Sequence, residues 1–83
     1  MNNMKFYAAY TYRSFVGPRD IFSEYDTYEE AATRAYELLC DDDDAGVFIN
    51  IDNKWYRVSD YNKETGKIVA YEYGNWDNII TIE

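Results

Sequence analysis

The 83-residue chain has no histidine and one cysteine, Cys40. Without histidine there is no Ser-His-Asp or Cys-His catalytic arrangement and no His-ligated metal site. A single cysteine cannot form a disulfide within the chain. Cys40 stands beside Leu38 and Leu39, and we expect it to be a small core residue. The aspartates that follow it would disfavour the thiolate of a reactive cysteine.

Long apolar runs and positive charges are also scarce. No stretch approaches the roughly 20 apolar residues that span a bilayer, and the first residues lack the pattern of a signal peptide. We therefore expect a cytoplasmic protein. Eight Lys and Arg against sixteen Asp and Glu give a net charge of −8 and a pI near 4.3. Because phosphates must be met by clustered cations, this balance disfavours direct binding to nucleic acid or to a membrane.

Apolar and aromatic residues, by contrast, are abundant. They make up 47% and 19% of the chain, too much for a disordered protein. At this length we expect a single domain, residues 1–83, which buries roughly 60–65% of the surface that the unfolded chain exposes.

Period-two alternation and turn residues predict strands at 5–12, 20–25, 47–51, 54–58, 67–73 and 79–82. Asp52 and Asn53 tolerate positive φ, so they predict a tight type I′ hairpin turn. The polar segments Ser59–Gly66 and Gly74–Asn78 are expected to be loops and turns.

One helix is expected at Tyr28–Cys40. Thr27 and Glu30 form a capping box, which satisfies backbone amides of the first turn. The apolar stripe consists of Ala31, Ala35, Leu38 and Leu39. Its small alanines allow a close approach to a sheet. We expect an α+β domain in the order ββαβββ, with the helix on one face of an antiparallel sheet.

Four consecutive aspartates follow this predicted helix: Asp41, Asp42, Asp43 and Asp44. Lys or Arg normally stabilises this end of a helix, because its free carbonyls carry a partial negative charge. Each misplaced charge costs about 0.3–1 kcal/mol at low salt. The run is either a solvated loop that keeps the protein soluble or a surface kept for a positively charged partner.

Two chemical interpretations of the acidic residues are disfavoured. A calcium loop beginning at Asp41 would place Asp43, Gly46 and Asp52 at positions three, six and twelve. Ala45 at position five has no side-chain oxygen, however, and position twelve is usually Glu. Sixteen acids make some carboxylate pair inevitable, and the sequence lacks a phosphate-binding Gly-rich loop or a nucleophile elbow. We expect no enzyme, no metal and no cofactor.

The chain also has ten tyrosines and two tryptophans, which a sheet this small cannot bury completely. These residues either cover a thin core or contact a partner, since Tyr and Trp are favoured in protein interfaces. Stacking of nucleic-acid bases on them is disfavoured by the nearby carboxylates of Glu24, Glu72, Asp60 and Asp77.

The small size, the helix within YDTYEEAATRAYELL (residues 25–39), the DDDD run and the lack of catalytic residues together resemble one class of proteins. These are small acidic phage-encoded inhibitors of bacterial defence, the anti-CRISPR and antirestriction proteins that mimic DNA. The resemblance implies a non-catalytic inhibitor in the host cytoplasm that occupies the nucleic-acid-binding surface of a CRISPR effector or nuclease. Carboxylates two residues apart on an extended chain are separated by about 6.6 Å, comparable to successive phosphates.

The candidate partner-binding residues are Asp41, Asp42, Asp43 and Asp44, followed by Glu37, Asp60, Glu64 and Asp77. Two alternatives stay open. The chain could be an acidic immunity protein or antitoxin that neutralises a basic nuclease. It could also be a homodimeric interaction module without an inhibitory role, paired through an edge strand such as Ile79–Ile82.

Overall fold

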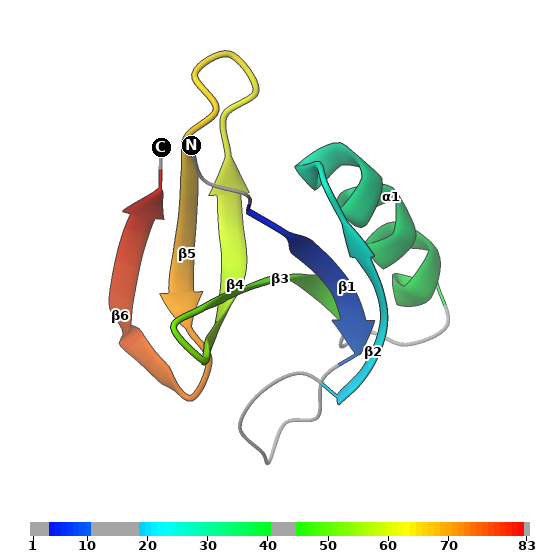
Figure 1. Ribbon diagram of the computed structural model, residues 1–83, viewed down its shortest axis with the longest axis horizontal. Coiled ribbons are helices and arrows are strands. Elements are labelled where there is room, and N and C mark those ends of the chain that lie inside the picture. The colour runs from blue at the N-terminus through cyan, green and yellow to red at the C-terminus, as the bar shows by residue number, and fades with distance from the viewer. Residues whose placement is uncertain (1–3, 11–18, 41–44, 83) are drawn as a thin grey trace.

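The computed structural model describes residues 4–10, 19–40 and 45–82, without the side chains of 19–22. Within these residues the elements are β1 (Phe6–Tyr10), β2 (Arg19–Tyr25), α1 (Tyr28–Leu39), β3 (Ala45–Ile51), β4 (Lys54–Tyr61), β5 (Ile68–Glu72) and β6 (Asn75–Ile82). The strands form one antiparallel sheet in the order β2-β1-β3-β4-β5-β6 (Figure 1). The predicted α+β class is confirmed. All six predicted strand segments are present, so the expected order ββαβββ only counted one strand too few after the helix.

Helix α1 begins where its capping signal predicted. Thr27 is the N-cap, and its hydroxyl accepts a hydrogen bond from the backbone N–H of Glu30 at 3.3 Å. The helix packs on β1, β2 and β3 at one end of the sheet (Figure 1). Its buried residues are Ala31, Ala35 and Leu38. In the described part of the chain no helix is long and apolar enough to cross a membrane.

Two residues at the end of the helix differ from expectation. Leu39 is 41% exposed, and Cys40 is exposed as the C-cap, so the prediction that they belong to the core was wrong. Successive helical residues are rotated by about 100°. Because Leu38 points at the sheet, the next two side chains turn away from it.

The sheet has a packed layer on each face. Beneath α1, Phe6 and Ala8 of β1 pack with Val47 and Ile49 of β3. On the opposite face a smaller cluster is formed by Phe48, Ala9 and Tyr73, with Tyr7 and Trp55 packed against it. β3 thus supplies alternate residues to two cores, as expected for a strand buried on both faces.

The extents of two strands also differ from expectation. Ser59–Tyr61, predicted as part of a loop, belong to β4. A register shift between Val58 and Asp60 lets the strand continue through this polar segment. β6 begins at Asn75, so the turn predicted at Gly74–Asn78 is much shorter. A second register shift accommodates that early start.

The hairpin between β3 and β4 determines the shape of the sheet. Its predicted turn is confirmed, with φ of 54° at Asp52 and 66° at Asn53. β4 pairs with β3 from Lys54 to Arg57 and then continues only along β5. The Arg57 guanidinium donates a hydrogen bond to the carbonyl of Ala45 at 3.3 Å. This side chain therefore bonds to the β3 backbone beyond the point where the two strands diverge.

Candidate binding groove and acidic surface

The run from Asp41 to Asp44, the main predicted site, lies outside the described residues. The structure does describe the helix that precedes it. The last turn of α1 contains no basic residue. Glu37, which lies in that last turn, accepts a hydrogen bond from the Arg34 guanidinium at 3.1 Å. Both partners of this surface pair are substantially exposed, so it contributes little stability.

The other three candidate residues lie on the β4, β5 and β6 side of the fold. Asp60, near the end of β4, accepts a hydrogen bond from the backbone N–H of Tyr61 at 2.9 Å. Glu64 is in the loop between β4 and β5, and Asp77 is exposed in β6. Together with Glu37 on α1, the described candidates come from separate elements. The structure does not gather them into one cluster.

Metal binding was also considered for the acidic residues. Among residues 4–10, 19–40 and 45–82, no group of three or more His, Cys, Asp and Glu side chains could hold a metal ion.

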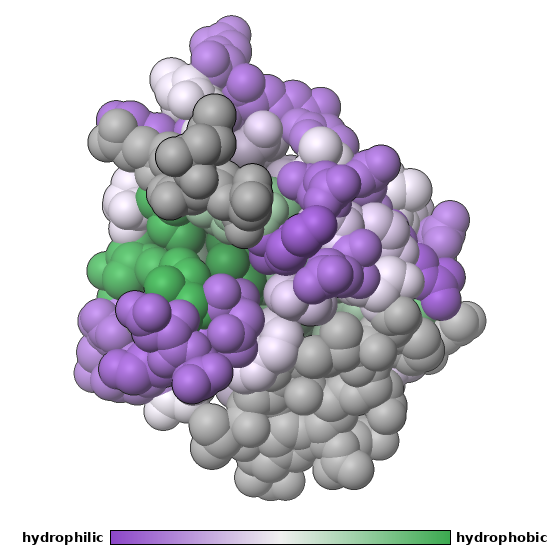
Figure 2. Space-filling view, in the orientation of Figure 1, coloured by the Kyte–Doolittle hydropathy of each residue, from purple (hydrophilic) through white to green (hydrophobic). Residues whose placement is uncertain are grey.

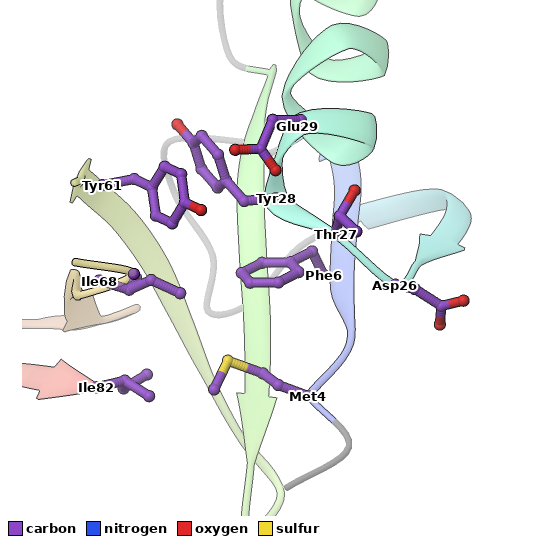
Figure 3. Close-up of a pocket in the computed structure, with 10 residues that line it drawn as sticks. Met4, Phe6, Asp26, Thr27, Tyr28, Glu29, Tyr61, Ile68 and Ile82 are labelled. Atoms are coloured by element: carbon purple, nitrogen blue, oxygen red, sulfur yellow. The ribbon is translucent and has the colours of Figure 1, made fainter. Parts of the chain in front are cut away.

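An apolar groove, which sequence analysis missed, lies between the N-terminal side of the fold and the wall made by β4, β5 and β6 (Figure 3). Its volume is about 320 Å³. The polar or backbone-lined positions are Asp26, Thr27, Glu29 and Gly66, and the apolar and aromatic ones are Met4, Phe6, Tyr28, Tyr61, Ile68 and Ile82. These residues are far apart in sequence and meet because β4 diverges from β3. The surplus of tyrosines was the sequence signal that pointed toward such a surface.

Aromatic contacts fix the upper part of the groove. Tyr28 stacks on Tyr61, with 4.4 Å between ring centroids and 29° between ring planes. On its other side Tyr28 meets Phe6 edge-on at 5.9 Å. Tyr28 is the first residue of α1, so the N-cap at Thr27 fixes the position of its backbone. The start of the helix is thereby joined to β1 and to the end of β4.

Negative charge surrounds these rings. Burial raises the pKa of Tyr28, and the charges of Asp60 and Glu29 add to that effect. Burial, then the charge of Glu29 and a hydrogen bond to it, raise the pKa of Tyr61. The other groove carboxylate, Asp26, forms an ion pair with Lys5. None of the described residues that line the groove is Lys, Arg or His.

These shifts predict an alkaline transition. Because the folded-state pKa values of Tyr28 and Tyr61 are raised, their contribution to stability is complete below about pH 10 and is lost as the pH rises through the raised values. We expect tyrosinate absorbance to show tyrosines that ionise above the usual pH of about 10, and the amplitude of this late phase should be smaller in the Tyr61→Phe variant. Glu29→Gln should bring this late titration to lower pH, whereas Glu30→Gln should not. A late phase that Tyr61→Phe leaves intact would contradict this assignment.

A second, smaller hollow continues from the groove along the helix. Its volume is about 250 Å³, and Tyr28 lines both. It lies between α1 and the strands β3 and β4, and its walls include Ala32, Tyr36, Leu39 and Arg57. Tyr36 is 70% exposed. An aromatic and apolar strip therefore extends from the groove toward the end of the helix that precedes the four aspartates.

Exposed aromatic and apolar residues also occur at the other side of the sheet, as the tyrosine and tryptophan counts predicted. Trp76 is 50% exposed and Ile79 is 62% exposed. The Trp76 ring meets Tyr71 and Tyr73 edge-on, each at 4.9 Å. Figure 2 shows an apolar patch on the side of the molecule where β6 lies. β6 is the last strand of the sheet, which confirms the predicted edge position of Ile79–Ile82.

Comparison of the chain with protein-family models, with curated proteins and with solved structures gave no match.

Proposed function

We propose that this chain is a non-catalytic inhibitor that binds the basic, nucleic-acid-binding surface of a host defence protein, such as a CRISPR effector or a nuclease. It would compete with DNA or RNA by presenting a similar pattern of negative charge. The observation that carries the proposal is the end of α1. Its last turn has no basic residue, and Asp41–Asp44 follow directly in the sequence.

The negative charges that follow the C-terminal end of α1 are unfavourable for the helix. Glu29 and Glu30 in the first turn suit the positive end of the helix dipole. The four aspartates follow its negative end, where they also repel one another. A sequence selected for stability alone would place a cation there. A partner with clustered Lys and Arg would supply the missing positive charge, which explains why the run is kept.

Exposed aromatic residues support the same proposal. Charge attraction between exposed groups is screened over about 8 Å at physiological ionic strength, so it gives orientation and association rate more than affinity. Tyr36 and Trp76, both exposed, provide apolar area that salt does not screen. Interfaces commonly combine such aromatic contacts with a charged rim.

The proposal is tested by capture from host lysate. The immobilised chain is incubated with lysate at low and at high salt, the bound protein is identified, and its nucleic-acid binding is measured with and without the chain. We expect a basic nucleic-acid-binding protein, retained at low salt and released at high salt, whose nucleic acid the chain displaces. The proposal would be overturned if retention of the captured protein did not depend on the salt concentration. It would also be overturned if the captured protein kept its nucleic acid when the chain was added.

The same experiment separates the two alternatives. An immunity protein or antitoxin would behave identically toward salt, and the identity of the captured nuclease would distinguish it. A homodimeric module predicts a tight dimer in light scattering and no basic partner.

A further inference from the structure

We propose that the groove lined by Tyr28, Tyr61 and Glu29 accepts an arginine side chain of the protein partner. The aliphatic stem would lie on the apolar wall and the guanidinium would lie at Glu29. This inference rests on the proposed function, because it assumes that the partner presents a basic surface. It adds a defined pocket to what would otherwise be attraction between charged surfaces.

The size of the groove suits one side chain. At about 320 Å³ it is at the lower end of the roughly 300–1,000 Å³ of small-molecule pockets. It is therefore large enough for an arginine with its flanking backbone and too small for a large cofactor. The groove is open to the surface, with Met4 and Ile82 at one end and Glu29 at the other (Figure 3), so a side chain from a docked protein can enter it.

The apolar walls of the groove suit the methylene groups of an arginine side chain. Met4 and Ile82 lie at the lower end of the groove, and Tyr61 and Ile68 line its β4–β5 side (Figure 3). Long basic side chains bury their methylene groups on such apolar surface while their charged head stays near water. The guanidinium is also the cation that most often stacks on aromatic rings. Tyr61 supplies such a ring, since Tyr28 already contacts Tyr61 on one side and Phe6 on the other.

The charge at the upper end matches the head group. Glu29 acts on both tyrosines, and the described lining of the groove contains no positive side chain. The Asp26 carboxylate is already paired with the Lys5 ammonium, whereas Glu29 has a hydrogen bond from the neutral Tyr61 hydroxyl and can still accept hydrogen bonds from a guanidinium. Asp60, whose charge also reaches Tyr28, adds to the local negative potential. A largely apolar groove lined by two carboxylates, of which Asp26 is paired with Lys5, favours a cation with an apolar stem over a neutral or anionic ligand.

The test uses n-butylguanidinium, which reproduces the arginine side chain, and follows the amide resonances of the isotope-labelled chain by NMR. We expect shifts that concentrate at Tyr28, Tyr61 and Ile68. Glu29→Gln should weaken binding about three- to tenfold, the loss expected when one charged contact is removed at a partly exposed site. The neutral planar isostere n-butylurea should bind more weakly than n-butylguanidinium. The head group of n-butylammonium is charged but not planar, so it cannot stack on the rings. Its affinity should lie between those of n-butylguanidinium and the neutral isostere.

Glu30→Gln is the matched control. Glu30 is adjacent to Glu29, lies in the same first turn and is exposed, but it does not line the groove. Both variants remove one charge from the same end of the helix dipole. Equal weakening by the two variants, equal binding of n-butylurea, or shifts scattered outside the groove would each overturn the assignment.

Failure of this inference is distinguishable from failure of the proposed function. If the lysate experiment yields a salt-sensitive nucleic-acid-binding partner whose capture Glu29→Gln does not weaken, the groove assignment falls and the proposed function stands. If n-butylguanidinium binds as expected but no basic partner is captured, the groove is a site for a guanidinium-bearing ligand and the inhibitor proposal falls.

Discussion

Replacing Phe48 by alanine should lower the free energy of unfolding by about 3–5 kcal/mol, the range for truncating a buried phenylalanine. Phe48 is 0% exposed and is one of the two largest fully buried side chains. Its ring meets Tyr73 at 6.0 Å, and the Arg57 guanidinium lies over it at 5.8 Å. Alanine would leave these groups around a cavity. Small domains have only about 5–15 kcal/mol of stability, so we expect a large fraction to be lost.

Chemical denaturation followed by circular dichroism measures this effect. The control is Ile79→Ala on β6, which removes an apolar side chain that is 62% exposed and should cost no more than about 0.5 kcal/mol. A loss below about 1 kcal/mol for Phe48→Ala would mean that the face opposite α1 does not hold a packed core.

Replacing Asp41, Asp42, Asp43 and Asp44 together by asparagine should weaken binding to the captured partner at least about fivefold at low salt. Exposed charge pairs contribute about 0.2–1 kcal/mol each, and four of them sum to roughly 1–4 kcal/mol when they act together. The same change should leave the free energy of unfolding unchanged or raise it, because the helix end loses charges that each cost about 0.3–1 kcal/mol. Weaker binding together with an unchanged or higher free energy of unfolding is expected when residues are retained for contact with a partner.

Calorimetric titration against the partner, beside thermal unfolding of the free chain, measures both quantities. A charge-matched comparison uses Asp42→Asn with Asp43→Asn against Glu30→Gln with Asp52→Asn, since each pair removes two negative charges. If the two pairs weaken binding equally, only net charge matters and the acidic run is not the contact surface.

Local signals explain which parts of the fold were predictable. Thr27 as N-cap and Asp52-Asn53 as a turn act within a few residues, so the sequence contained all the information needed. The ends of β4 and β6 depend instead on register shifts against β5. A shift is decided by the neighbouring strand, which a pattern within one segment does not reveal.

The groove could not be predicted for a similar reason. Met4, Tyr28, Tyr61 and Ile82 are separated by twenty or more residues along the chain, and they meet only because β4 leaves β3 after Arg57. The position of the Glu29 carboxylate at that groove, rather than in open solvent, follows from the same divergence. Charge and tyrosine content predicted a binding surface of some kind, but tertiary structure determines which residues compose it.

The outer strand β6 has a consequence for how the protein behaves in solution. Its last four residues, Ile79–Ile82, carry no charge, and Ile79 is largely exposed. Most proteins protect an edge strand of this kind with lysine, proline or a covering loop, because its unpaired backbone N–H and C=O groups can pair with another chain. In this protein the mutual repulsion of molecules that each carry a net charge of −8 opposes such pairing. As the pH approaches the pI of about 4.3, this repulsion vanishes, and we expect association through β6 to lower the solubility of the protein.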